Sequence, residues 1–444
     1  MDDLLTDLLR RAGARGATAA DAFLIQEEHS TVQVRLGQVE TVKHAREQRL
    51  SLRVFKSRAA ASASTSDLSR ASLDQLVDEA VGLSRVTSED PMAGLPAFDE
   101  LAKEVPDLDL ADPDGHRLTP EQKIDLAKRA EAAALESDSR IMNSEGAEFF
   151  ERQAELAYAS SLGWSGRYLT SLFSLTVAPV AVADGQMQRD SWYSLSRKRH
   201  RLEPPETIGR IAANRALKRL GARKVKTCEV PVIFDPESAG SLVHALAVAA
   251  SGPSLYRRAS FLVDRIGENI ASPSVTIVDD GARRCGLGSR PFDGEGLGTR
   301  RVELVKDGVL KSYLLDSYSG RKLDRASTAH AVRDAGGVTV GATNLYLAPG
   351  QDRPEALIES VDSGFYVTEL IGFGVNFVTG DYSRGAVGHW IEKGELAYPV
   401  EEITIAGNLL QMFEAIDGIG NDLVFRSRVS SPTIRIGRMT VAGE

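Results

Sequence analysis

The chain has almost no cysteine: Cys228 and Cys285 are the only two among its 444 residues. Two thiols cannot build a disulfide framework, and such sparse use is typical of proteins that fold in a reducing compartment. No apolar run approaches the roughly 18 residues that a membrane-spanning helix needs. The opening MDDLLTDLLRRAG places its arginines after the apolar residues, which is the reverse of a secretory signal. These absences predict a cytoplasmic protein without a membrane segment.

The chain also lacks a surplus of positive charge. Its 53 lysines and arginines are outnumbered by 62 aspartates and glutamates, which gives a formal net charge of -9. Broad, sequence-independent binding of nucleic acid depends on the opposite balance, so we do not expect nucleic acid as a partner. The densest basic segment, RKRHR at 197–201, is typical of a solvated loop and receives no functional assignment.

Signatures of several common active sites are missing. The sequence has neither a Walker pattern nor a Gly-x-Ser-x-Gly elbow. The glycines of GEGLGTR at 294–300 precede a hairpin rather than a helix, so they are interpreted as a turn of the backbone and not as a phosphate site. No two of the seven histidines have the spacing that places metal ligands on one helical face. From the residues alone, His244 within LVHALAVA at 242–249 is better explained as a hydrogen-bonded residue of a packed helix than as half of a metal site.

What the chain does contain divides it into two dissimilar halves. Residues 1–221 alternate helical periodicity with strand-like segments rich in β-branched residues, and a segment near 87–118, rich in proline and acidic residues, is typical of a linker. We therefore expect an N-terminal α+β half with helices packed on antiparallel sheet. The order helix, strands, helix occurs twice in this half, and an internal duplication would explain it.

Individual elements can be placed within the N-terminal half. A helix is predicted after Thr119, because Pro120 suits a first turn and Gln122 completes a capping box. Ser72 is the expected N-cap of a second helix, SLDQLVDEAVGLSRV. Four short strands are expected, two of them joined by a turn at Gly37: DAFLIQEE, TVQVRL, QVETVKHA and RLSLRVF.

Residues 222–444 change in character to strands punctuated by glycine. One hairpin is predicted to turn at Asp307 and Gly308, because this pair tolerates the positive φ of a tight turn. A second is predicted to turn at Lys393 and Gly394. The expected fold class is therefore α+β, with a mostly antiparallel β C-terminal half.

Long blocks of the sequence resemble the TldD/PmbA family of metallopeptidase-related proteins. The resemblance extends over nearly the whole chain, and the blocks GVNFVTGDYSRGA and YPVEEITIAGN are most similar to the PmbA (TldE) branch. Four stretches carry the rest of the resemblance: RVFKSRAAASASTSDLS, VIFDPESAGSLVHALAVAASGPSLYRRASFLVDRIG, SRPFDGEGLGTRRVELVKDGVLKSYLLDSYSGRKL and FGVNFVTGDYSRGAVGHWIEKGELAYPVEEITIAGNLLQMF.

The resemblance gives His244 a second interpretation. In the catalytic branch a helix carries His-Glu-x-x-x-His, in which the two imidazoles bind zinc and the glutamate is the general base. With Tyr-Arg-Arg at 256–258 as the anchor, the first His falls at His244, the Glu at Ala245 and the second His at Ala249. The cysteine ligand that the catalytic branch supplies from its tail is also missing here. We therefore expect no catalytic residue and no metal ligand, with His244 as a relic position in the core or in a groove.

The function that the resemblance implies is that of a non-catalytic, PmbA/TldE-like subunit in a heteromeric zinc peptidase. A TldD-like partner would hold the zinc, and the complex would degrade or trim unstructured peptides. Such a subunit can form a wall of the chamber and hold the substrate backbone as an added strand. Two alternatives remain: a regulatory binding protein resembling a gyrase modulator, and an independent, homodimeric peptidase or hydrolase with an unrecognised site.

The candidates for peptide or partner binding lie in TGDYSRG at 379–385, which we expect to be a loop joining two strands. Asp381, Tyr382, Ser383 and Arg384 gather a carboxylate, a phenol, a hydroxyl and a guanidinium there. An independent enzyme would need such a constellation to be catalytic. The other interpretation is a turn in which Asp and Ser side chains bond their own backbone.

Overall fold

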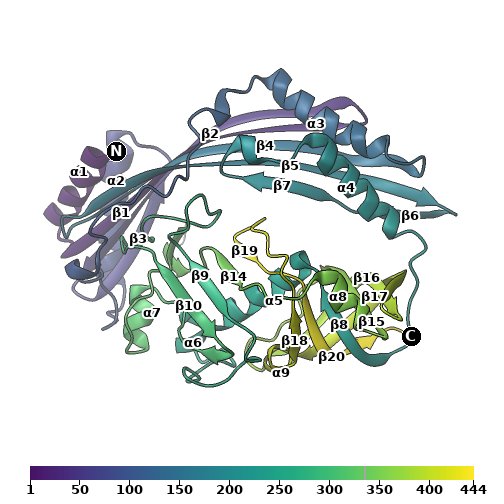
Figure 1. The fold of residues 1–444 in the computed structure, drawn as a ribbon. Coiled ribbons are helices and arrows are strands. Elements are labelled where there is room, and N and C mark those ends of the chain that lie inside the picture. Colours follow the sequence, from purple (N-terminus) through teal and green to yellow (C-terminus); the bar gives the residue numbers. More distant parts are fainter. Residues whose placement is uncertain (335–336) are drawn as a thin grey trace.

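The computed structural model describes residues 1–334 and 337–444. Its N-terminal half is built on one seven-stranded antiparallel sheet with the order β3-β2-β1-β4-β5-β6, to which β7 adds by pairing with β5. Figure 1 shows this sheet arching over the C-terminal half. Its strands are β1 (Ala19–Arg35), β2 (Gln38–Lys56), β3 (Ala59–Thr65), β4 (Ile141–Ser160), β5 (Ser165–Ala183), β6 (Gln186–Arg189) and β7 (Trp192–Ser196).

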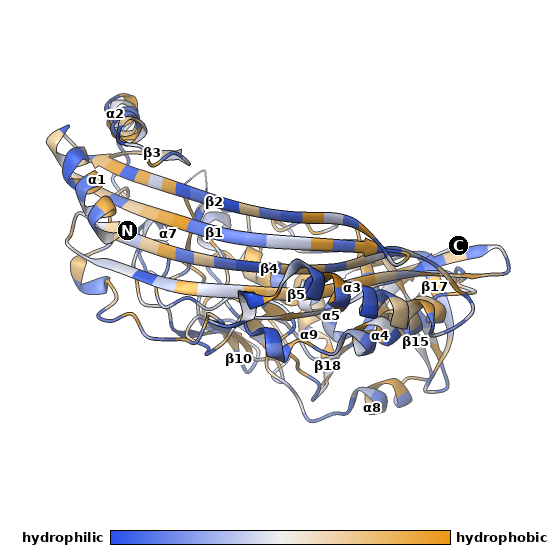
Figure 2. Cartoon of the chain, turned by 90° about the horizontal axis from the view of Figure 1, so that it is seen from above, coloured by the Kyte–Doolittle hydropathy of each residue, from blue (hydrophilic) through white to orange (hydrophobic). Residues whose placement is uncertain are grey.

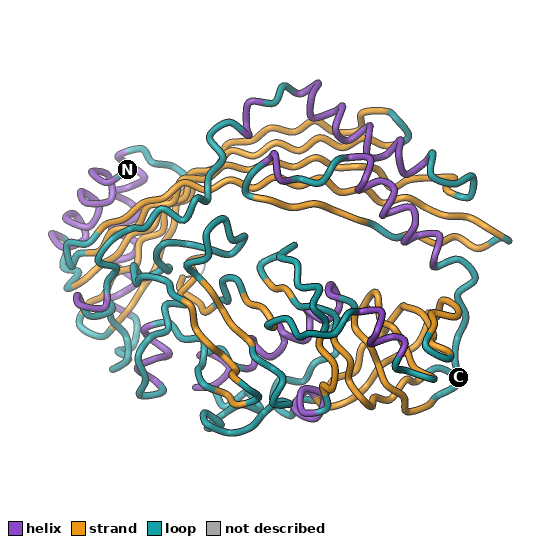
Figure 3. The backbone as a smooth tube through the Cα atoms, in the orientation of Figure 1, coloured by secondary structure: helices purple, strands orange, loops and turns teal. Residues whose placement is uncertain are grey.

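Four helices cover one face of this sheet, in two pairs at opposite ends (Figure 3). Leu24 of β1 belongs to the core under one pair and Val32 of the same strand to the core under the other, so both pairs lie on the face of even-numbered β1 residues. The element order helix, strands, helix occurs in each half of the sheet, as the sequence predicted. The pairs are α1 (Asp2–Ala14) with α2 (Arg70–Val86), and α3 (Pro120–Leu135) with α4 (Pro205–Lys218).

Helix starts follow the expected capping chemistry with one correction. The Thr119 side chain accepts from Gln122 N, and the Gln122 side chain accepts from Thr119 N, which confirms the capping box of α3. The prediction of Ser72 as the N-cap of α2 is wrong. Ser69 has the extended backbone of a cap, and its hydroxyl accepts from Ser72 N, so the helix begins earlier than its apolar periodicity does.

The prediction of four short strands is wrong, because they form only two, β1 and β2. The tight turn at Leu36 and Gly37, with φ of 48° and 74°, is confirmed. Residues 25–29 of β1 are half-buried, between buried segments on either side. Figure 2 shows hydrophilic colouring in the middle of the sheet. The alternation of apolar and polar residues stops there, although the two strands remain paired.

The segment near 87–118 runs between the two halves before it reaches α3. Ala102 packs with Trp164 and Phe292, which belong to the sheet half and the C-terminal half respectively. Trp164 Nε1 donates to the Ala102 carbonyl at 2.5 Å. Further along, Ser171 N donates to the Leu110 carbonyl. The segment therefore closes the seam between the halves.

The C-terminal half contains three further sheets, with orders β17-β16-β15-β8-β20-β18, β11-β10-β9-β14-β19 and β12-β13. Most pairs are antiparallel, and β8 with β15 and β14 with β19 are the parallel pairs among the described strands. Both predicted hairpins are confirmed, with positive φ at Asp307, Gly308, Lys393 and Gly394. The fold is thus α+β.

The elements of the C-terminal half are arranged around one of their number, the apolar helix α5. They are β8 (Cys228–Phe234), α5 (Pro236–Ala249), α6 (Gly252–Tyr256), β9 (Ile277–Asp280), β10 (Arg301–Lys306), β11 (Val309–Leu310), α7 (Ser317–Lys322), β12 (Ala331–Asp334), β13 (Gly337–Val340), β14 (Leu345–Leu347), α8 (Pro354–Glu359), β15 (Ser363–Ile371), β16 (Asp381–Glu392), β17 (Glu395–Asn408), α9 (Leu409–Glu414), β18 (Ile416–Ile419), β19 (Val429–Ser430) and β20 (Ile434–Ala442). No helix in the described ranges is long and apolar enough to cross a membrane.

Candidate functional site

A groove of about 600 Å³ lies where α5 meets the long sheet and the C-terminal tail. Asp235 caps α5 through its carboxylate, which accepts from Ser238 N at 2.8 Å, and Pro236 occupies the first turn. Four parts of the chain line the groove: the outer face of α5, Trp192 of β7 with Arg215 of α4, Tyr366 of β15, and the tail around residues 422–431.

His244 lies on the groove side of α5 and is exposed, so it is a groove residue and not a core residue. The hydrogen-bonded core histidine inferred from the residues alone is therefore wrong. The physical reason is helical geometry: the neighbours of His244 face the core, while His244 itself faces the groove. Partial burial lowers the pKa of His244, and the charge of Arg428 lowers it further, so the imidazole is neutral near pH 7.

The residues around His244 do not fit a catalytic zinc ion. Ala245 and Ala249 have no ligand atoms, and they are 5% and 0% exposed in the main core. Within residues 1–334 and 337–444 no three His, Cys, Asp or Glu side chains are placed to share a metal ion. Catalytic zinc needs about three protein ligands and an open position, so His244, Ala245 and Ala249 do not together form such a site.

Most charged side chains that line the groove already have a partner. The Trp192 ring contacts the guanidinium groups of Arg215 and Arg426, whose Cζ atoms are 5.3 and 4.7 Å from its ring centre. The partner contacts are Arg215 with Asp190, Arg426 with Glu203, Glu237 with Tyr193, Asp235 with Ser238 and Asp422 with Thr433. The contacts of Arg426 with Glu203 and Trp192 join the tail to the N-terminal half.

The TGDYSRG segment is not a loop throughout, which corrects the prediction. Its residues from Asp381 onward open strand β16 and pair with β17, beginning with Asp381 opposite Asn408. Because side chains alternate along a strand, Tyr382 is buried while Asp381 and Ser383 are exposed. The four candidate side chains therefore do not converge, and none of them lines the groove beside His244.

Arg384 bonds within its own chain. Its Nη2 donates to the Leu370 carbonyl at 3.2 Å, and its Nε is buried without a hydrogen-bond acceptor. The Asp381 carboxylate instead accepts from the Thr379 hydroxyl at 2.6 Å. The Asp381 side chain thus bonds its own turn, and Arg384 joins β16 to the end of β15.

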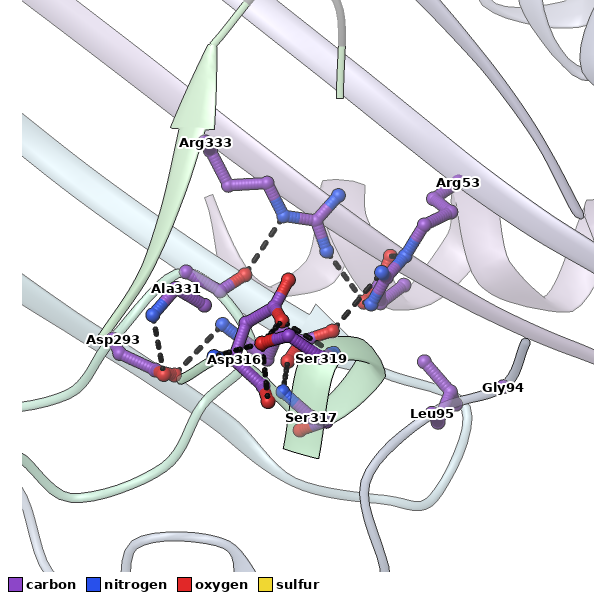
Figure 4. Close-up of polar contacts among 12 residues, drawn as sticks. Arg53, Gly94, Leu95, Asp293, Asp316, Ser317, Ser319, Ala331 and Arg333 are labelled. Carbon is purple, nitrogen blue, oxygen red and sulfur yellow. Dashed lines mark hydrogen bonds and ion pairs between the residues drawn. The ribbon is translucent and has the colours of Figure 1, made fainter. Parts of the chain in front are cut away.

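A buried ionic network was missed by the sequence analysis (Figure 4). Arg53 of β2 pairs with Asp21 of β1 at 2.6 Å and with Glu295 of the C-terminal half at 3.0 Å. Arg333 of β12 pairs with Asp21 at 2.5 Å, and Ser317 N donates to Glu295 at 2.9 Å. Burial alone would raise the pKa of Asp21, but the charges of Arg333 and Arg53 hold it below its usual value.

Glu295 of this network lies in GEGLGTR at 294–300, the glycine-rich segment interpreted as a turn. The turn itself is confirmed: Asp293 accepts from Glu295 N, Leu297 N and Ala331 N, and Gly296 has a φ of 87°. Its acidic residues were not recognised as partners for Arg53, which is 242 residues away from Glu295 in the sequence. No local pattern reports a contact of that separation.

Comparison with known proteins identifies the class. Three family models match, described as domain 1, the central domain and the C-terminal domain of PmbA/TldA metallopeptidases, over residues 20–84, 113–220 and 227–443. The chain is 40% identical over 415 residues to the metalloprotease PmbA of Escherichia coli O157:H7, covering 93% of this chain and 90% of that protein. The chain therefore belongs to the PmbA/TldD family.

Solved structures agree with the fold. A Bacteroides thetaiotaomicron protein, described as a proposed modulator of DNA gyrase, superposes with a TM-score of 0.92 at 27% identity, covering 100% of this chain and 99% of that one. TldE from Thermococcus kodakarensis gives a TM-score of 0.90 at 20% identity, over 99% of this chain and 100% of that one. The second likeness concerns the fold alone.

Proposed function

We propose that this chain is the non-catalytic, TldE-like subunit of a heteromeric metallopeptidase. The observation that carries the proposal is the α5 groove of this chain. His244 lies on the groove wall, but the positions of the general base and of the second zinc ligand are occupied by two buried alanines, Ala245 and Ala249. A groove without those groups can hold a peptide but cannot activate a water molecule on zinc. The zinc would belong to a TldD-like partner.

The substrate of the complex would be unstructured peptide in the cytoplasm. The arched sheet and the α5 groove would form part of a chamber wall, and open strand edges could hold a peptide through its backbone. Residues 38–49 of β2 pair only with β1, since β3 joins β2 at Leu50. Recognition through the backbone would give low sequence specificity.

The partner would bind near the start of β16. Asp381 and Ser383 are exposed there, next to three large exposed apolar side chains of the preceding segment: Ile371, Phe373 and Val378. Contiguous exposed apolar side chains are typical of interaction surfaces. Tyr382 and Arg384 would support this surface from beneath rather than touch the partner.

Co-purification of the endogenous complex is the first test. We expect a TldD-like chain at equal stoichiometry, peptidase activity of the complex, and neither activity nor stoichiometric zinc in this chain alone. A homodimer that cleaves peptides without a partner would contradict the proposal and favour an independent enzyme. Binding to gyrase without peptidase activity in any complex would favour the regulatory alternative.

The partner surface has its own test. Asp381→Asn with Ser383→Ala should weaken association with the TldD-like chain while leaving the melting temperature of the free subunit nearly unchanged. Glu392→Gln, at the exposed far end of β16, is the matched control. Unchanged association of the double variant would show that this surface faces solvent in the complex.

A further inference from the structure

One edge of strand β5 has no partner strand over residues 165–170. β4 pairs with the opposite edge along this stretch, and β7 joins the free edge only beyond it. Ser171 N donates across the free edge to the Leu110 carbonyl. Because the amide groups of a strand point alternately to its two edges, the N–H groups of Arg167 and Leu169 point to the same side as that of Ser171. Neither has a hydrogen bond among the described residues.

A cavity of about 780 Å³ lies against this free edge. Residues 167–169 of β5 and residues 105–111 of the connecting segment both line it. A Cβ added to Gly166 would lie 3.1 Å from Val105 Cγ2, so the connecting segment runs close beside the strand. The unpaired amides of β5 therefore border an enclosed slot rather than open surface.

A second cavity, of about 1120 Å³, continues from the first: Ala111, Pro113, Glu155 and Leu169 line both. Glu155 is the cross-strand partner of Gln26 on one side and of Leu169 on the other. Cross-strand partners share a face, so Leu169 lies on the helix-bearing face with the even-numbered β1 residues. The second cavity thus crosses the middle of that face, and the two cavities together form a path past the free edge of β5.

The lining of this path is acidic. Of its ionisable side chains, seven are carboxylates and three are cations: Glu27, Glu28, Glu47, Asp107, Asp109, Asp112 and Glu155, against Arg46, Arg167 and Lys198. Glu47, Asp107 and Asp112 have no ion pair with any described residue. Unpaired carboxylates beside a cavity favour a ligand that brings positive charge.

We propose that the two cavities bind an extended peptide segment with basic side chains, which adds to the free edge of β5 as a short strand. The peptide backbone accepts from the N–H groups of Arg167 and Leu169, and its cationic side chains lie near the unpaired carboxylates. In this mode of recognition the main chain gives affinity and the side chains give specificity. The inference rests on the proposed function, because it assumes that the chain handles peptides, and it deepens that function by naming basic segments as the preferred ligand.

The charge preference is tested with two peptides that share one backbone pattern. Acetyl-(Thr-Lys)3-amide and acetyl-(Thr-Glu)3-amide have as many residues as the free stretch of β5, and calorimetry measures their binding to the full-length chain at near-physiological salt. We expect the lysine peptide to bind about tenfold or more tightly than the glutamate peptide, because charge-assisted contacts are lost in the second. Equal binding of the two would overturn the charge assignment.

Strand addition is tested with two N-methylated forms of the lysine peptide. One form is methylated at the three threonine amides and the other at the three lysine amides. Because alternate amides of a strand point to opposite edges, one form should lose about tenfold in affinity, and the other should bind nearly as the parent does. Equal losses, or no loss in either form, would overturn strand addition. The wild-type chain is used throughout, so a misfolded variant cannot obscure this result.

Variants locate the site on β5. Leu169→Pro removes the N–H that faces the cavity and keeps the neighbouring amides that bond β4, a position where strands tolerate proline. Binding of the lysine peptide should fall about tenfold, whereas Leu169→Ala, which keeps the N–H, should bind as wild type does. Glu47→Gln with Asp107→Asn should reduce the preference for lysine over glutamate peptide, and Glu392→Gln, exposed at the far end of β16, should not.

The possible failures are distinguishable. Binding that survives Leu169→Pro would mean that the lysine peptide is held elsewhere on the acidic surface, which overturns the site. If neither unmethylated peptide binds, the site also fails, while peptide turnover by the reconstituted complex would leave the proposed function standing. If in addition no TldD-like chain associates, both the site and the proposed function fail.

Discussion

The two halves of the molecule meet in two regions that differ in the burial and pairing of their ionisable side chains. At the α7 end, Arg53, Asp21 and Glu295 are nearly or fully buried and bonded to one another across the seam. At the α5 end, exposed His244 lies on the wall of a groove, without a hydrogen bond or ion pair among the described residues. A buried charge must be paired because its desolvation is costly. An exposed polar group can remain unpaired in the free protein and is then available to a ligand. The first region is thus suited to holding the halves together and the second to binding.

The largest expected effect comes from breaking the buried network. Arg53→Met should destabilise the protein by about 3–5 kcal/mol, because Glu295 loses its cation while remaining fully buried. Chemical denaturation followed by circular dichroism measures the change. Arg46→Met is the control, since Arg46 pairs with Glu28 at an exposed site and should contribute about 0–1 kcal/mol. Equal effects of the two variants would show that the network does not hold the seam.

A smaller effect should appear with pH at the groove end of α5. Burial raises the pKa of Asp235 to about 6, above the ordinary value of 3.8. The folded state then favours the protonated acid, so this contribution is present below pH 3.8 and is lost as pH rises through about 6. The loss corresponds to about 3 kcal/mol. Asp235→Asn keeps an oxygen for Ser238 and should gain stability relative to wild type as pH rises from 4 to 7.

Melting curves across that pH range test this sign. Asp99→Asn, at an exposed turn, is the control and should track the wild type throughout. A constant offset between Asp235→Asn and wild type at every pH would show that Asp235 does not titrate in this window.

The tether of the tail should matter less still. Arg426→Ala removes an ion pair with Glu203 in which both side chains are 29% exposed, and this solvent access limits the loss to about 1 kcal/mol. We expect faster cleavage of the tail near residues 421–428 under limited proteolysis, with a melting temperature close to wild type. A proteolysis rate equal to that of wild type would mean that the other contacts of Trp192 suffice.

The smallest expected effect concerns metal. His244→Gln should leave the zinc content of the assembled complex unchanged, because Ala245 and Ala249 bring no ligand atoms to His244. Elemental analysis of the purified complex measures it. Loss of one zinc per complex in the variant would show that His244 still binds metal across the subunit interface.

Local chemistry in the sequence was sufficient for much of the fold. The capping box at Thr119 and the Asp307-Gly308 hairpin were predicted because neighbouring residues determine them. Strand length was not predicted, because β1 and β2 continue through a polar middle where alternation no longer reports burial. The N-cap of α2 was misplaced for a related reason: its first turn, from Arg70, is polar.

The candidate site was predictable only in part. The sequence drew attention to His244, and its place on the groove wall depends on tertiary packing that no local pattern reports. The grouping of Asp381 to Arg384 failed, since strand alternation sends neighbours to opposite faces.

The central pairing of the long sheet has a consequence for how the chain folds. β1 pairs on one side with β2, its neighbour across a two-residue turn, but on the other with β4, where Asp21 meets Ser160. Closing so long a loop costs entropy before its contacts form, so pairings of large sequence separation slow folding. The β1–β2 hairpin would then form early, while the other edge of β1 is still unpaired. During synthesis that edge is the surface most exposed to aggregation until residues 141–160 arrive to cover it.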